Sequence, residues 1–156
     1  MKQTEHSDLT NEQLIDQVNA SMPPCVDTLG SGKVVSFTND KNGQPSVSVQ
    51  FENTERHCHS GTIVQGGFVA GMIDNAMSLA VIVSTQYKFN PATLELKVNY
   101  LGQTTLGNNT AVGRIIKMGS SIAFLEGELR NAAGKKVATA TATAKLIPFV
   151  GISPGT

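Results

Sequence analysis

The sequence lacks tryptophan, and its aromatic residues together make up 5% of its 156 positions. Platforms that stack single-stranded nucleic acid need aromatic rings, so such a platform is not expected. Basic and acidic residues number 12 each, which gives a formal net charge of zero. This balance lacks the basic excess that attracts nucleic acid or anionic membrane surfaces. We therefore predict neither a nucleic-acid partner nor a membrane partner.

Cysteine is scarce as well. Cys25 and Cys58 are the two cysteines, too few for a disulfide framework, and they do not form a C-x-x-C pair. The first ten residues, MKQTEHSDLT, contain no apolar signal core. The longest apolar run, residues 79–83, is far shorter than the roughly 20 residues of a membrane span. We expect a cytoplasmic protein with one core, because the length suits a single domain.

The most informative stretch is residues 65–84, QGGFVAGMIDNAMSLAVIVS. As a helix it is apolar on nearly every side, which is typical of a buried helix. The exceptions are Gly67, Gly71, Asp74 and Ser78, which form one small, polar stripe at helical spacing. Burying an unpaired carboxylate is costly, so Asp74 is predicted to be the working residue of an acyl-transfer site. The alternative interpretation is a solvated helix face.

The flanking segments predict one short helix and six strands. Thr10 and Gln13 form a capping-box pattern for the short helix, and Pro23 and Pro24 stop it. Alternation and turn residues predict strands at 33–38, 46–52, 93–100, 110–118, 121–130 and 136–146. The order predicts an α+β fold in which a curved antiparallel sheet wraps around one long central helix. We divide the chain into an N-terminal helix and linker (1–24), the main domain (25–147) and a tail (148–156).

Two details of the strands carry predictions about the sheet. The last strand alternates alanine with threonine, and its small alanine face is placed near the middle of the sheet, under the helix. In the strand 93–100, simple alternation puts Leu94 on one face with Leu96, Val98 and Tyr100. It puts Thr93 on the opposite face.

Gly66 and Gly67 lie where the central helix begins. The first N–H groups of a helix have no internal partner, and the helix dipole adds partial positive charge there. Without side chains in the way, these groups suit a carbonyl-polarising site, although the pair could equally be a tight loop-to-helix junction. Asp74 follows Gly67 by seven residues, roughly 10 Å along the axis. Both can act on one substrate only if they come from two helices, as in a two-fold dimer with antiparallel central helices.

The loop before the helix contains His57, Cys58 and His59. Without further clustered ligands this is a poor zinc site, so no metal is predicted. Cys58 could be a nucleophile with a neighbouring histidine as base, but it ranks below Asp74. His59 could orient a substrate carbonyl or a water, or be an ordinary loop histidine. Thr93 could hold a water, or reflect β-propensity alone.

Three runs together resemble the hot-dog-fold acyl-CoA thioesterases of the phenylacetate (PaaI-like) type. They are G-T-I-V-Q-G-G-F-V-A-G-M-I-D-N-A, T-L-E-L-K-V-N-Y-L and G-K-K-V-A-T-A-T-A-T, and the resemblance covers roughly residues 45–147. It implies a hot-dog fold, a homodimer or homotetramer, and hydrolysis of an acyl-CoA to carboxylate and free CoA at the dimer interface. It implies no metal or redox cofactor, with coenzyme A present only as part of the substrate.

The resemblance also implies roles for single residues. Asp74 would be the general base or the nucleophile, and the N–H of Gly67, with Gly66 beside it, would polarise the thioester carbonyl. The substrate-binding residues would be Gln65, His59 and Thr93. The polar stripe of the helix adds Ser78 to this set. Gly119 and Ser120 lie where a basic residue often follows the glycine in this family. Substitutes for that coenzyme A phosphate contact would be Lys97, Arg114 and Lys117.

Two other functions stay open on the sequence. One is a hot-dog dehydratase for 3-hydroxyacyl thioesters, which would need a histidine base in the acyl pocket. The other is a non-catalytic module that binds acyl thioesters, which would bind its ligand without releasing free thiol.

Overall fold

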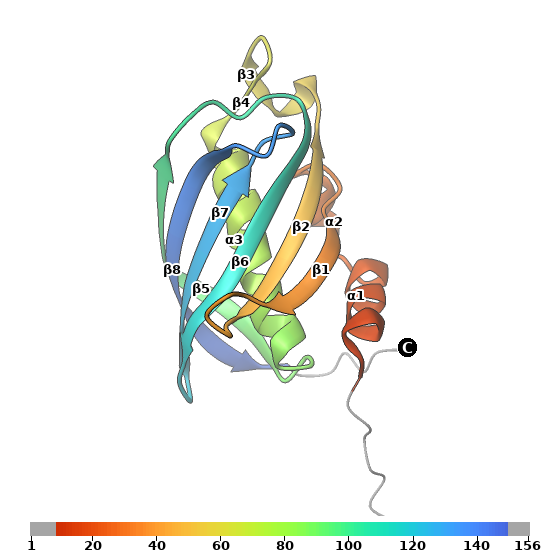
Figure 1. Cartoon of the computed structure of the whole chain (residues 1–156), viewed down its shortest axis with the longest axis vertical. Helices are drawn as coiled ribbons and strands as arrows, with labels where there is room; N and C mark the ends of the chain where they lie inside the picture. The colour runs from red at the N-terminus through yellow and green to blue at the C-terminus, as the bar shows by residue number, and fades with distance from the viewer. Residues whose placement is uncertain (1–8, 150–156) are drawn as a thin grey trace, which may run out of the picture.

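The computed structural model describes residues 9–149 of the chain. A six-stranded antiparallel sheet curves around the long helix α3, which lies along its concave side (Figure 1). The helices are α1 (Asn11–Ala20), α2 (Pro24–Asp27), the 3-10 helix η1 (Glu55–His57) and α3 (Gly66–Ser84). The strands of the sheet are β1 (Lys33–Asn39), β2 (Pro45–Asn53), β5 (Phe89–Tyr100), β6 (Gly107–Met118), β7 (Ile122–Arg130) and β8 (Lys136–Pro148). This is the predicted hot-dog arrangement.

The helix α3 forms the core, as its apolar sequence predicted. Its fully buried side chains include Met72, Ile73 and Met77. By length and composition α3 could also cross a membrane, but half of its apolar window is buried inside this fold. Burial between helix and sheet therefore accounts for the apolar sequence of α3.

Glycines on two central strands let the helix approach the sheet. A Cβ at Gly113 on β6 would collide with the backbone of Ala76, and one at Gly127 on β7 would meet Ile73. The strand order is β1-β2-β6-β7-β8-β5, so β8 is the fifth strand, next to an edge. The alanines of β8 are buried as expected, but the prediction that β8 lies near the middle of the sheet is wrong. The glycines of β6 and β7, rather than the alanines of β8, make the closest approach possible.

The strand β5 differs from its prediction in a way that matters for the site. It begins at Phe89, four residues earlier than expected, and it accepts Pro91 because it is an edge strand. Its register against β8 shifts between Thr93 and Glu95. This bulge puts Thr93 on the helix side and leaves Leu94 62% exposed, so the predicted simple alternation is wrong here.

The segment before α3 is more ordered than a polar loop. It contains η1 and a small hairpin of β3 (Cys58–Ser60) and β4 (Ile63–Val64). Near the N-terminus, the predicted capping box of α1 is present, and the Thr10 side chain accepts from the N–H of Gln13. The boundaries 1–24, 25–147 and 148–156 stay predictions, and residues 1–8 and 150–156 lie outside the described part.

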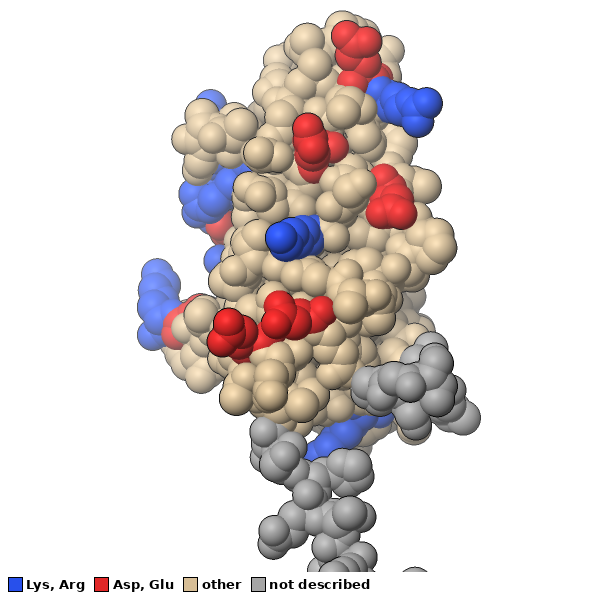
Figure 2. Space-filling model, turned by 90° about the vertical axis from the view of Figure 1, so that its right-hand side faces the viewer, with Lys and Arg blue, Asp and Glu red and all other residues tan. Residues whose placement is uncertain are grey.

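The surface over α1 and β1 carries charges of both signs. Figure 2 shows acidic and basic side chains scattered over this face, without a continuous basic patch among the coloured residues. The distribution fits the net charge of zero.

Candidate active site

The start of α3 is held by three hydrogen bonds. The N–H of Gln65, the N-cap residue, donates to the carbonyl of His57 over 2.8 Å. The Gln65 side chain then folds back, and its Oε1 accepts from the N–H of Gly67 over 2.6 Å. On the other side, the hydroxyl of Tyr100 on β5 donates to the Gly66 carbonyl over 2.8 Å. The N–H of Gly67, which the sequence predicts to polarise a carbonyl, therefore lies at an exposed helix start, and in this conformation it donates to an amide oxygen of its own chain.

Asp74 lies two turns further along α3 and is half-buried, between fully buried Ile73 and half-buried Asn75. Its Oδ1 accepts a hydrogen bond of 2.9 Å from the Thr93 hydroxyl. Among residues 9–149 this is its one hydrogen bond, and no ion pair reaches it. The second carboxylate oxygen therefore has no hydrogen-bond or ion-pair partner among these residues.

The sequence-predicted residues fall into two groups. The structure joins Asp74 to Thr93, and it joins Gln65 to Gly67. The two groups sit on one straight helix, seven residues or roughly 10 Å apart, so a single chain does not bring them together. Ser78 is half-buried one turn beyond Asp74. His59 is exposed on the hairpin, where its ring hydrogen-bonds Ser60 over 2.9 Å.

Neither histidine of the loop is placed as a base. His57 is buried, its Nδ1 accepts the N–H of Thr54 over 3.0 Å, and its ring packs edge-on against Phe68. Neither His57 nor His59 hydrogen-bonds to Asp74 within the described residues. Over the same residues no group of three or more His, Cys, Asp or Glu side chains is arranged to hold a metal ion. The geometry gives the dehydratase alternative no support.

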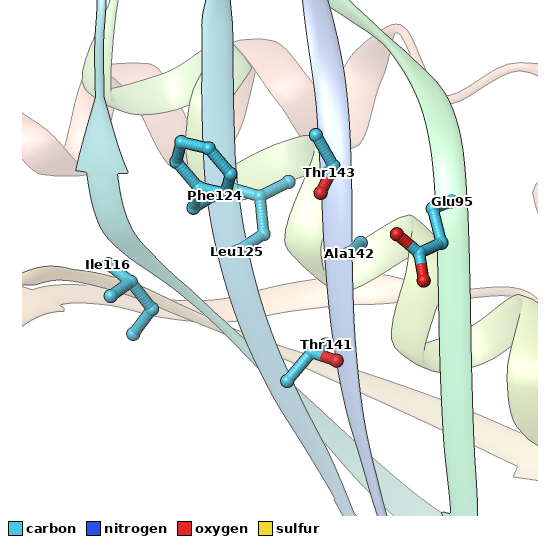
Figure 3. Close-up of a pocket in the computed structure, with 7 residues that line it drawn as sticks. All are labelled: Glu95, Ile116, Phe124, Leu125, Thr141, Ala142 and Thr143. Atoms are coloured by element: carbon cyan, nitrogen blue, oxygen red, sulfur yellow. The ribbon is translucent and has the colours of Figure 1, made fainter.

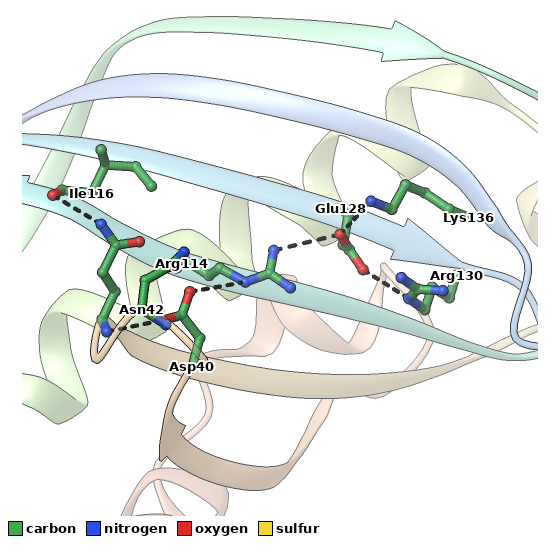
Figure 4. Close-up of polar contacts among 8 residues, drawn as sticks. Asp40, Asn42, Arg114, Ile116, Glu128, Arg130 and Lys136 are labelled. Carbon is green, nitrogen blue, oxygen red and sulfur yellow. Dashed lines mark hydrogen bonds and ion pairs between the residues drawn. The ribbon is translucent and has the colours of Figure 1, made fainter.

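The outer face of the sheet holds a different cluster of charges. Glu128 accepts from Arg130 over 2.7 Å, from Lys136 over 2.9 Å and from Arg114 over 3.5 Å (Figure 4). Arg114 also pairs with Asp40 at 3.9 Å. Burial alone would raise the pKa of the Glu128 carboxyl, but the three cations outweigh burial and hold this pKa below its ordinary value. Arg114 is therefore committed to this cluster, which weakens its case as a phosphate ligand.

The same outer face carries a shallow pocket. Its lining residues are Glu95, Ile116, Phe124, Leu125, Thr141, Ala142 and Thr143 (Figure 3). Phe124 and Thr143 are cross-strand neighbours on β7 and β8, on the face opposite the buried alanines. The sheet thus separates this pocket from Asp74, and the pocket has no part in the candidate site.

The sequence reading missed Tyr100 as a site residue. Alternation grouped Tyr100 with Leu96 and Val98 on one face of β5, and the structure turns this face toward the helix. A hydroxyl-bearing ring at the end of an edge strand, beside the start of the helix, was the available signal.

A long central helix wrapped by a curved antiparallel sheet is the hot-dog fold, and in this chain the helix carries a carboxylate and paired glycines. Residues 61–138 match the family model of the thioesterase superfamily. The chain therefore belongs to the thioesterase superfamily, and its activity is thioester hydrolysis, as the sequence predicted. A Saccharolobus solfataricus protein, named as an inferred esterase, is 28% identical over 101 residues, covering 65% of this chain and 70% of that protein.

Solved structures share the fold. A thioesterase from Haemophilus influenzae superposes with a TM-score of 0.75 at 18% identity, covering 93% of this chain and 95% of that one. A phenylacetic acid degradation-related protein from Ralstonia eutropha gives 0.72 at 23% identity, covering 85% and 98%. A Streptococcus mutans protein solved with bound acetyl-CoA gives 0.65 at 24% identity, covering 76% and 90%.

Proposed function

We propose that this chain is an acyl-CoA thioesterase of the phenylacetate (PaaI-like) type, which hydrolyses an acyl-CoA to a carboxylate and free coenzyme A. The observation that carries the proposal is the Asp74–Thr93 pair, a carboxylate with one free oxygen on an otherwise apolar core helix. The similar Streptococcus mutans protein is bound to acetyl-CoA, which supports coenzyme A as the thiol part of the substrate. The similar Ralstonia eutropha protein is related to phenylacetic acid degradation, which supports this type.

The proposed site needs a second copy of the chain. The strand β5 pairs with β8 on one side, and no strand of residues 9–149 lies on its other side. Around it Leu94, Tyr100 and Leu101 are each more than half exposed. Apolar side chains on an unpaired strand edge favour pairing with another strand. A two-fold axis at Lys97 would add the second β5 antiparallel to the first, with Leu96 of each protomer across from Val98 of the partner subunit.

This register would also assemble the site. Tyr100 lies three residues beyond such an axis, and Thr93 lies three ladder positions before it once the extra residue of the bulge is left out. Thr93 would therefore lie across from Tyr100 of the partner subunit. Thr93 holds Asp74, and Tyr100 holds the carbonyl of Gly66. The same pairing therefore brings the carboxylate of one protomer toward the glycine amides of the other. Each dimer would contain two sites, and a tetramer would contain four.

In the proposed reaction, Asp74 either deprotonates a water or attacks the thioester carbonyl carbon itself. The glycine N–H groups of the partner subunit stabilise the oxyanion that forms. When the oxyanion collapses, the C–S bond breaks and the thiolate of coenzyme A leaves. It takes the proton that Asp74 removed from water or, in the direct route, a proton from solvent. In the direct route, water then hydrolyses the acyl-aspartate. Neither route requires a metal or redox cofactor.

A thiol-release assay tests the reaction. The full-length protein is incubated with short, long and aromatic acyl-CoAs, beside the Asp74→Ala variant. We expect free thiol from at least one substrate and none above background from the variant. Binding of acyl-CoA without thiol release would instead support the non-catalytic module, and equal release by Asp74→Ala would overturn the assigned site.

Complementation tests the shared site. Asp74→Asn removes the carboxylate, and Gly67→Pro removes the N–H at a first-turn position that tolerates proline. Each variant alone should be inactive. Random assortment of the two at equal amounts gives half mixed dimers with one intact site each, so about one quarter of wild-type activity should return. No recovery, despite mixed dimers shown by native mass spectrometry, would place both groups in one protomer.

A further inference from the structure

One peptide unit at the start of α3 is held at both ends. The carbonyl of Gly66 and the N–H of Gly67 belong to the same planar peptide group. Tyr100 donates to the carbonyl end over 2.8 Å, and Gln65 accepts from the amide end over 2.6 Å. The amide end is the group that the proposed function assigns to the oxyanion.

We propose that Tyr100 is a positioning residue, which aims the Gly67 N–H at the thioester oxygen by fixing the carbonyl of the same peptide. This inference rests on the proposed function. Because the peptide is planar, fixing its oxygen also fixes the direction of its N–H, which points the opposite way. A hydrogen bond to the carbonyl also polarises the peptide and strengthens the N–H as a donor. Tyr100 therefore acts on the substrate through the peptide, without touching it.

The glycine at position 66 fits this arrangement. A Cβ there would lie 3.2 Å from the ring and hydroxyl of Tyr100, closer than side chains normally approach. Glycine thus admits the tyrosine as well as the substrate. From the sequence alone, access for the substrate was the only one of these two explanations for a glycine at this position.

The side chain of Gln65 marks where the substrate oxygen would bind. Its Oε1 is an amide carbonyl oxygen, the same kind of acceptor as a thioester oxygen, and it sits 2.6 Å from the Gly67 nitrogen. The N–H therefore points away from the helix toward an incoming carbonyl. The Gln65 side chain is exposed, so an incoming carbonyl could displace it, whereas Tyr100 belongs to the strand β5.

The test compares hydroxyl deletions at the two tyrosines of the chain, Tyr87 and Tyr100. Tyr100→Phe keeps the ring against Gly66 and removes the hydrogen bond. We expect kcat to fall about tenfold, an effect of the size of one lost hydrogen bond, here the one to the Gly66 carbonyl. KM should stay within about twofold, because the loss falls on the transition state. Tyr87→Phe, at the far end of α3, is the matched control and should leave both constants unchanged.

A spectroscopic measurement separates positioning from general support of the fold. Acyl-CoA is bound to the slow Asp74→Asn variant with and without Tyr100→Phe, and the thioester C=O stretch is recorded by infrared difference spectroscopy. We expect the polarising shift of this band to be smaller without the Tyr100 hydroxyl. A lowered kcat with an unchanged band, or a wild-type kcat, would overturn the inference.

A second variant protects the test if Tyr100→Phe folds poorly. Gly66→Ala keeps both amide groups but pushes the Tyr100 ring away. It should lower kcat, and the double variant should lose less than the sum of the two, because both break one contact. Additive losses would count against the contact. If Asp74→Asn retains activity, the proposed function fails; if only Tyr100→Phe is neutral, this inference alone fails.

Discussion

Asp74 and Glu128 are two carboxylates on opposite sides of the same sheet, and their surroundings differ sharply. Glu128 is 6% exposed and accepts from three cations, so its acceptor capacity is used within the protein. Asp74 has one neutral partner, Thr93, and lies on a helix that is apolar on nearly every side. A saturated carboxylate braces strands, whereas one with a free oxygen can take part in chemistry. The difference in partners separates a structural role from a catalytic one better than burial does.

The sharpest test of this comparison is Asp74→Asn. The amide keeps the size and the contact with Thr93 but loses the charge and the basicity, so turnover should fall about 10³-fold. Thermal stability should change little, because the carboxylate has no cation partner in the described residues. Thiol release and differential scanning calorimetry measure the two effects. Asp16→Asn, on the exposed face of α1, is the matched control and should behave as wild type. Near wild-type turnover in Asp74→Asn would remove Asp74 from the mechanism.

The next test removes the neutral partner. Thr93→Val keeps the branched shape at the bulge and deletes the hydroxyl that orients the Asp74 carboxylate. We expect kcat to fall about tenfold, as for one charge-assisted hydrogen bond. Thr141→Val on the outer face deletes a hydroxyl without such a partner and should leave turnover unchanged. Equal kcat values for the two variants would show that Asp74 needs no orienting partner.

The Thr93 contact also shows what the sequence could and could not predict. Local periodicity predicted α3 and the six strands, because a buried helix and half-buried strands leave clear patterns in the sequence. Asp74 was noticed because it interrupts the apolar pattern of that helix. The side of β5 that carries Thr93 was mispredicted, because a bulge of one residue reverses the alternation and leaves no mark in a single sequence. The prediction that β8 lies near the middle of the sheet was wrong for a related reason. Small residues show that a helix can pack closely on a strand, but the sequence does not show whether the helix packs closest on the alanines of β8 or on Gly113 of β6. Tyr100 was missed because its contact joins elements 34 residues apart.

On the other carboxylate, Glu128→Gln should alter stability rather than activity. The substitution leaves Arg130 and Lys136 without their anion, and both are about 40% exposed, so water compensates in part. We expect the free energy of unfolding to fall by about 1–2 kcal/mol. This corresponds to a lowering of Tm by roughly 2–8 °C for a chain of this length. Turnover at 25 °C should stay within about twofold of wild type. A large loss of turnover in a folded variant would mean that the outer face communicates with the site.

The smallest expected effect is the pH dependence of that stability difference. The pKa of the Glu128 carboxyl is lower in the folded protein than in the unfolded chain, because its cations outweigh the opposing effect of burial. A lowered folded pKa means that the stabilisation is complete above the unfolded value, about 4.3 for glutamate, and is lost as pH falls through the folded pKa. Glu128→Gln has no such proton to bind, so its Tm should approach that of wild type below about pH 4. Calorimetry of both proteins at pH 7 and pH 3 measures the gap. If the gap were equally wide at both pH values, the three cations would stabilise Glu128 by packing rather than by its charge, and the contrast with Asp74 would no longer rest on electrostatics.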